Sequence, residues 1–230
     1  MDSLDGFMKS QAPTPLRPLL GQTLLAVEDS RLACEALRLV CIRSGARIRR
    51  ADSLSSARRH LQVYRPTVVL IDMGLPDGSG AELLADLAQA TPRVSVILGM
   101  SGDDTQAEAA REAGADGFLA KPISSLAAFQ AAVLAHLPRD RQPLGPRPLL
   151  EDEIQPDRIA FHDDIAHAQE ALAAGEAAYA AQFLESLAQC SADSALRDQA
   201  VRLSWAPDNA DEIARTQALL EDRLGTRLAV

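Results

Sequence analysis

Five side chains that could carry out chemistry stand at or just after the ends of short apolar runs. Glu28 and Asp29 follow TLLAV, Asp72 follows TVVLI, Ser101 follows VSVILGM, and Lys121 follows GFLA. Clustered carboxylates repel one another, so a cation is expected where several of them meet. Few and partly solvated oxygen ligands suit Mg2+, which keeps several waters and works beside phosphate. Together these residues indicate a phosphoryl site that holds Mg2+.

The elements that must position these residues follow an alternating pattern. Between residues 23 and 137, five short apolar runs alternate with five amphipathic stretches, which is typical of βαβ units around a parallel sheet. Helix starts are predicted at Ser30, Ser53, Ser79 and Ser124, and helix ends at Gly45 and Gly114. In a doubly wound α/β sheet the carboxyl ends of the strands share one edge. We therefore expect the five side chains to converge there.

Four short motifs occur in a fixed order along this part of the chain: AVEDS, DMGLPDGSG, GMSG and FLAKP. On these motifs, residues 22–138 resemble the receiver domain of bacterial two-component response regulators. The resemblance implies a flavodoxin-like fold with five parallel strands in the order 2-1-3-4-5. It covers about half of the chain, and a joint match at these five site positions is more specific than any one motif.

The resemblance also implies a role for each residue of the phosphoryl site. Asp72 is the expected phosphoacceptor, and it would attack the phosphorus of a phosphohistidine or a small phosphodonor. Glu28, Asp29, Asp72 and the backbone carbonyl of Gly74 are the expected ligands of Mg2+. Lys121 is expected to contact the phosphoryl oxygens. A surface ion pair with one of the acids is the alternative for Lys121, but the chain has only two lysines beside 21 arginines.

Ser101 and Phe118 are the expected switch. Phosphorylation adds about two negative charges, so Ser101 should move toward the phosphoryl group and Phe118 should move into the vacated space. Plain packing in the core is the alternative for Phe118. Gly74 leaves the site open where many relatives carry a larger side chain, which puts the phosphate lifetime in question. Pro122 is expected to fix the loop of Lys121 through a cis or otherwise constrained peptide bond.

The rest of the chain divides into flanking segments and a helical module. Residues 1–21 are expected to be flexible, residues 139–156 form a predicted proline-rich linker, and residues 157–230 form the predicted module. Helices are predicted at about 156–174, 176–190, 192–204 and 208–224. Apolar residues at helical spacing would line one seam: Ile165, Ala168, Ala171, Leu172, Tyr179, Phe183, Leu184 and Leu187. Such helices could form a bundle within one chain or across a homodimer.

Charge limits what the helical module can do. Residues 151–230 contain six Arg and sixteen Asp plus Glu, which gives 6 − 16 = −10. This charge argues against DNA binding, which depends on neutralising phosphates. The module also lacks recognisable enzymatic motifs, and the lone His162 and His167 have no recognisable partners in the sequence. We therefore expect no nucleic-acid partner and no separate enzymatic output.

A weaker similarity concerns residues 171–189, ALAAGEAAYAAQFLESLAQ. This stretch is similar to the turn and helix of histidine phosphotransfer domains, in which the phosphorylated histidine would fall near Glu185. That histidine is absent here. If the similarity holds, the module is a docking or dimerising relative of such domains that cannot carry phosphate.

Two functions agree with the sequence. The first is a response regulator that accepts a phosphoryl group from a histidine kinase or a histidine phosphotransfer protein and signals through a helical protein-interaction output. The second is a phosphorelay intermediate or phosphate sink whose helices are only structural. Neither is an enzyme beyond its own phosphorylation and dephosphorylation. Without an apolar stretch of about 18 residues or a signal peptide pattern, we expect a cytoplasmic protein with no membrane partner.

Overall fold

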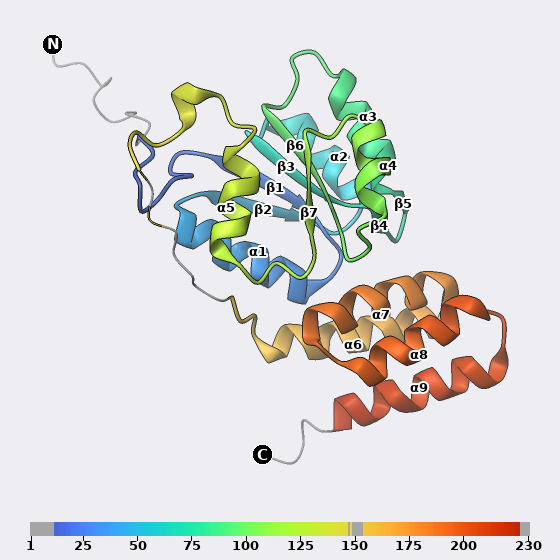
Figure 1. The fold of residues 1–230 in the computed structure, drawn as a ribbon. Coiled ribbons are helices and arrows are strands. Elements are labelled where there is room, and N and C mark those ends of the chain that lie inside the picture. Colours follow the sequence, from blue (N-terminus) through green and yellow to red (C-terminus); the bar gives the residue numbers. More distant parts are fainter. Residues whose placement is uncertain (1–11, 147, 149–153, 226–230) are drawn as a thin grey trace, which may run out of the picture.

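The computed structural model describes residues 12–146, 148 and 154–225, which form an α/β domain followed by a helical bundle (Figure 1). Five parallel strands form one sheet in the order β2-β1-β3-β6-β7. These are β1 (Thr23–Val27), β2 (Arg47–Ala51), β3 (Val68–Asp72), β6 (Val96–Ser101) and β7 (Gly117–Ala120). Counted along the chain, β6 and β7 are the fourth and fifth strands of this sheet. The observed order is therefore the predicted 2-1-3-4-5, and the doubly wound fold is confirmed.

Helices cover both faces of the sheet, so that β3 is buried along its whole length. The helices α1 (Arg31–Ser44) and α5 (Leu126–Leu134) pack on one face, where Leu24, Leu37 and Phe129 are fully buried. The opposite face carries α2 (Leu54–Val63), α3 (Gly80–Gln89) and α4 (Gln106–Glu112), which pack around Leu25, Val27 and Ile71. Two apolar layers thus hold the strand ends in fixed positions.

Most of the predicted helix boundaries are confirmed. Ser30, Ser53 and Ser79 cap α1, α2 and α3 with their side chains, while Gly45 and Gly114 adopt positive φ after α1 and α4. The prediction of Ser124 as a cap is wrong by one residue. Ser125 has the extended backbone of a cap, and its hydroxyl accepts a hydrogen bond from the amide of Ala128.

A short hairpin directly after Asp72 was not predicted. It pairs β4 (Gly74–Leu75) with β5 (Gly78–Ser79). Gly78 adopts φ 146°, which favours glycine. Gly80 is required for a different reason, because a Cβ there would collide with the backbone carbonyl of Asp72. The hairpin therefore returns the chain tightly against the end of β3.

Both flanking segments contact the α/β domain. Residues 1–11, in the segment expected to be flexible, lie outside the described residues, but Leu19 is fully buried in the core. In the predicted linker, Arg139–Arg141 form a 3-10 turn. Ile154 is also buried, and its amide donates to the carbonyl of Ser124. The chain that leads into the bundle is thus anchored at Ile154, close to α5.

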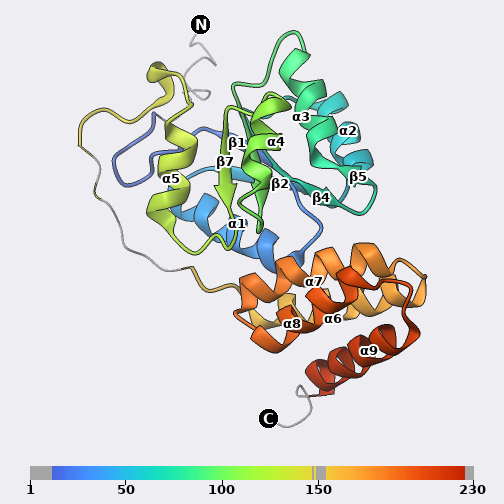
Figure 2. The same cartoon turned by 45° about the vertical axis from the view of Figure 1, so that its right-hand side comes forward.

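The C-terminal helices form an antiparallel bundle with a core of its own. They are α6 (Arg158–Ala173), α7 (Ala177–Ser191), α8 (Ser194–Trp205) and α9 (Ala210–Gly225), each within about two residues of its predicted position. All eight predicted seam residues lie in or against this core. In Figures 1 and 2, α6 and α7 lie below α1. The helix α9 lies on the side of the bundle that faces away from the α/β domain. In the part of the chain that the structure describes, every helix is too short or too polar to cross a membrane.

Candidate phosphoryl site

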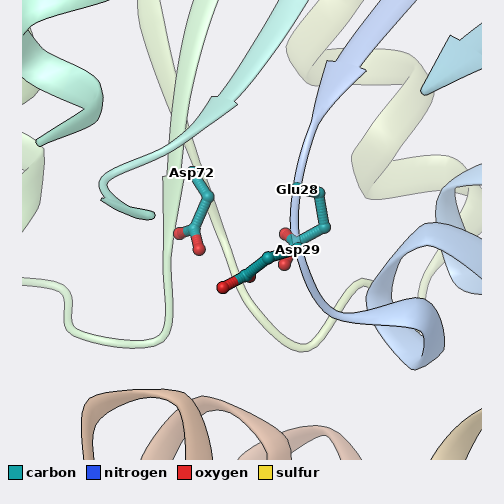
Figure 3. A group of neighbouring side chains, drawn as sticks. All are labelled: Glu28, Asp29 and Asp72. Atoms are coloured by element: carbon teal, nitrogen blue, oxygen red, sulfur yellow. The ribbon is translucent and has the colours of Figure 1, made fainter. Parts of the chain in front are cut away.

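Three carboxylates lie together at the carboxyl edge of the sheet, as predicted. Glu28 and Asp29 follow β1, and Asp72 is the last residue of β3, the neighbouring strand. One oxygen from each carboxylate lies within 4.8 Å of the others. Figure 3 shows the three side chains at the ends of their strands, with helices of the bundle below them.

Lys121 joins this cluster from the end of β7. Its Nζ lies 2.6 Å from Glu28 Oε2 and 3.1 Å from Asp72 Oδ2. The Lys121 side chain is 1% exposed, so both ion pairs are shielded from solvent and the alternative of a surface ion pair is wrong. The peptide bond between Lys121 and Pro122 is cis, which confirms the predicted constraint at this loop.

Burial governs the protonation of the site. It raises the pKa of Glu28 and of Asp72 to about 7, although the charge of Lys121 acts in the opposite direction. Burial, followed by repulsion from Asp72, raises the pKa of Asp29 to about 6. Burial alone would lower the pKa of Lys121, but the charges of Asp72 and Glu28 raise it above its ordinary value. Three acids thus share one buried ammonium group, and an additional cation would relieve their repulsion.

The donor set fits Mg2+. Two ligands on opposite sides of this ion lie about 4.2 Å apart, and hard carboxylate oxygens are its preferred protein ligands. The spacing of up to 4.8 Å needs only a small adjustment. Asp29 and Asp72 also line a cavity that leaves room for water ligands.

The other site residues lie around the same cavity. Ser101 ends β6 and lines the cavity, where its hydroxyl accepts from the amide of Asp103. The amide of Gly74 donates to the Asp72 carboxylate. Phe118 lies in β7, half-buried against the core that includes Ala110. The roles of Ser101 and Phe118 as a switch, and of the Gly74 carbonyl as a ligand, stay predictions.

Comparisons with known proteins agree with this geometry. Residues 24–133 match the model of the response regulator receiver domain. Residues 24–133 are a receiver domain. The KDP operon transcriptional regulatory protein KdpE of Escherichia coli K12 is 30% identical over 128 residues, which are 56% of each chain. DpiA, a transcriptional regulatory protein of the same strain, is 36% identical over 106 residues, or 44% of this chain and 46% of its own.

The solved structures that match also align to only part of the chain. A response regulator from Chloroflexus aurantiacus J-10-fl is 34% identical, with a TM-score of 0.42, and the match covers 44% of this chain and 85% of the other. The chain spans about half the length of the curated relatives it matches. The receiver match ends at residue 133, before the bundle begins at Arg158.

The bundle docks on the receiver through a buried carboxylate. Asp164 of α6 is 1% exposed, and it accepts hydrogen bonds from Ser30 Oγ and from the amides of Arg31 and Leu32 at 2.7–3.0 Å. The amides of Arg31 and Leu32 belong to the first turn of α1 and have no partner within the helix, and a negative charge is favourable at this helix end. Leu32 itself inserts into the core of the bundle. Sequence patterns gave no signal for this contact, because an Asp in an amphipathic helix is usually solvated.

A second contact reaches the acidic cluster itself. Tyr179 of α7 donates its hydroxyl proton to Asp29 Oδ2 at 2.7 Å. His167 Nε2 lies 2.9 Å from the same hydroxyl oxygen, so His167 must donate to it through Nε2–H. His167, which has no recognisable partner in the sequence, thus has one in Tyr179. Tyr179 was assigned only to the apolar seam, and its ring does pack there beside Phe183.

The cavity over Asp72 is lined by both parts of the protein. Its volume is about 910 Å3. The receiver lines it with Asp29, Asp72 and Ser101, while α7 lines it with Gln182 and Glu185 among others. Glu185, the position assigned to the missing histidine, thus lies over the phosphoryl site. The face of α7 that the similarity to phosphotransfer domains singled out is the face that covers Asp72.

Proposed function

We propose that Asp72 accepts a phosphoryl group in a Mg2+-dependent reaction. The donor is a histidine kinase or a histidine phosphotransfer protein, whose phosphohistidine carries the group. An oxygen of Asp72 attacks the phosphorus, the P–N bond breaks, and its electron pair returns to the imidazole, which then takes a proton from water. The single observation that supports this most strongly is the meeting of Glu28, Asp29, Asp72 and Lys121 at one strand edge.

Each residue at this edge has a part in the proposed reaction. Lys121 offers its Nζ, 3.1 Å from Asp72 Oδ2, to the oxygens of the incoming group. Glu28 and Asp29 would hold Mg2+ together with Asp72 and the carbonyl of Gly74. The bound ion would neutralise charge between the nucleophile and the phosphoryl group. Ser101 would then move toward the phosphoryl group and Phe118 into the vacated space, as the resemblance to receiver domains implies.

We further propose that the output is the α6–α9 bundle and its protein contacts. The bundle touches the acidic pair directly, through Tyr179 and Asp29, so a change at the site alters a contact of the output. KdpE and DpiA are named transcriptional regulatory proteins. Residues 151–230 carry a net charge of −10, which opposes binding to DNA. The direct contact also favours this output over a phosphate sink with an inert bundle.

The phosphoacceptor is tested by the intact mass of the protein after incubation with phosphoramidate. We expect the mass of one phosphoryl group to be added in the presence of Mg2+, and not after chelation with EDTA. Asp72→Asn should stay unmodified under both conditions. Addition of the group to Asp72→Asn at the rate of the wild type would contradict the assignment.

A further inference from the structure

Two glycines beside the phosphoacceptor leave gaps that side chains of α7 fill. Gly74 stands two residues after Asp72, and a Cβ there would collide with the carboxamide nitrogen of Gln182. Gly102 follows Ser101, and a Cβ there would collide with Gln189 Oε1. The two glutamines are seven residues apart, so they lie on one face of α7. The bundle thus supplies side chains at two positions where the receiver has none.

These side chains face the place where a phosphoryl group would stand. Gln182, Glu185 and Gln189 line the same cavity as Asp72 and Ser101. A volume of about 910 Å3 accommodates a phosphoryl group and several waters, since a water occupies about 30 Å3 in the liquid. In-line attack on the phosphorus requires a water opposite the Asp72 oxygen. That direction leads into the cavity, toward α7.

A carboxamide can orient such a water. Its NH2 group donates hydrogen bonds and its carbonyl oxygen accepts them, so Gln182 can hold a phosphoryl oxygen and the water together. A glutamine performs this task in the hydrolysis of GTP by small GTPases. Gln182 is well placed because its nitrogen lies against Gly74, whose own amide donates to the Asp72 carboxylate. Its side chain is exposed to the cavity and takes no part in the apolar core of the bundle.

We propose that Gln182 positions water for hydrolysis of phosphorylated Asp72, so that the bundle limits the lifetime of the receiver's own phosphoryl group. The water oxygen bonds to phosphorus, the bond between phosphorus and the Asp72 oxygen breaks, and its electron pair returns to the carboxylate. Both water protons leave on the inorganic phosphate. This inference rests on the proposed phosphorylation of Asp72, and it assigns to the bundle a control of that same site.

The test is the half-life of the phosphoryl group on the full-length protein. Wild type and variants are labelled with phosphoramidate, freed of donor, and followed by intact mass in Mg2+. We expect Gln182→Ala to lengthen the half-life by about tenfold or more, as the loss of one positioning hydrogen bond of about 1.4 kcal/mol would. The initial rate of labelling is measured on the same samples, so that slower hydrolysis is distinguished from a general loss of phosphoryl transfer.

Two further variants separate positioning from structure. Gln199→Ala is the matched control, since Gln199 bonds to Thr216 within the bundle, between α8 and α9, and its half-life should equal that of the wild type. Asp164→Ala leaves Gln182 in the sequence but releases α6 from α1. It should also lengthen the half-life, because the undocked bundle no longer holds Gln182 over Asp72. An unchanged or shorter half-life in Gln182→Ala would overturn the inference. If no variant is labelled at all, the proposed phosphoacceptor itself is wrong.

Discussion

Tyr179 and Asp29 are 150 positions apart in the chain, and a hydrogen bond of 2.7 Å joins them. Asp29 belongs to the cluster that is expected to hold Mg2+. The hydroxyl and the ion therefore compete for the lone pairs of one carboxylate. Through this bond the bundle is sensitive to what occupies the phosphoryl site.

Tyr179→Phe should bind Mg2+ several-fold more tightly than the wild type at about pH 8. The substitution removes the competing hydroxyl and keeps the ring in the apolar seam. A hydrogen bond to a charged group contributes about 1.5–3 kcal/mol. Without that bond, the binding free energy of Mg2+ becomes more favourable by a part of this amount. Titration calorimetry measures the affinity, and a weaker affinity for Mg2+ in Tyr179→Phe would contradict the competition.

Asp164→Ala should undock the bundle while both parts stay folded. Three donors of α1 lose their shared acceptor, which we expect to weaken docking by about 2 kcal/mol or more. Hydrogen exchange of the amides of Arg31 and Leu32 should accelerate accordingly. Asp163→Ala is the control, because the pair of Asp163 with Arg31 is exposed and is worth less than about 1 kcal/mol. Equal protection in the two variants would argue against this anchor.

These contacts mark the limit of what sequence patterns could predict. The strand ends of Asp72 and Lys121 were predictable, because apolar runs locate buried strands and parallel strands bring their ends together. The partners of Asp164 and Tyr179 were not, because they depend on how two folded parts dock. The local pattern around Asp164 is that of any amphipathic helix, whether its polar face meets water or another domain.

Smaller features escaped prediction for local reasons. Ser124 and Ser125 are adjacent and of the same type, so the sequence alone does not choose which of them caps α5. The β4-β5 hairpin has two residues in each strand, which is too short for a periodic signal. The glutamines of α7 carried no signal either, since the gaps at Gly74 and Gly102 lie far away in the sequence.

Stability should depend on pH and Mg2+ in a linked way. The pKa values of Glu28 and Asp72 are about 7 and that of Asp29 is about 6, whereas an unfolded carboxyl has a pKa of about 4. The folded metal-free protein therefore binds protons more tightly, and its free energy of unfolding should fall as the pH rises from about 4 to 7.

Mg2+ binds the deprotonated carboxylates, so it should raise the melting temperature more at about pH 8 than at about pH 5. Differential scanning calorimetry at the two pH values, with Mg2+ or with EDTA, gives this comparison. Asp72→Asn removes one of the titrating carboxylates, so the rise in melting temperature caused by Mg2+ should differ less between the two pH values. A larger effect of Mg2+ at the lower pH would be inconsistent with the raised pKa values.

Self-association is a separate question, which light scattering answers. If phosphorylation lets the docked protein pair with a second copy, the molar mass should double with Mg2+ and beryllofluoride, a stable mimic of the phosphoryl group. We expect this doubling in the wild type and its absence in Asp72→Asn. An unchanged mass, with binding of beryllofluoride confirmed, would rule out a homodimer and direct attention to a separate protein partner.

Hydrogen exchange of α7 shows whether the bundle responds to the state of Asp72. Exchange is measured on the full-length protein with Mg2+ alone and with Mg2+ plus beryllofluoride. We expect exchange in α7 and in the first turn of α1 to change when beryllofluoride binds, and to stay constant in Asp72→Asn. Identical exchange in both states of the wild type, with beryllofluoride bound at the site, would mean that the bundle does not respond to Asp72.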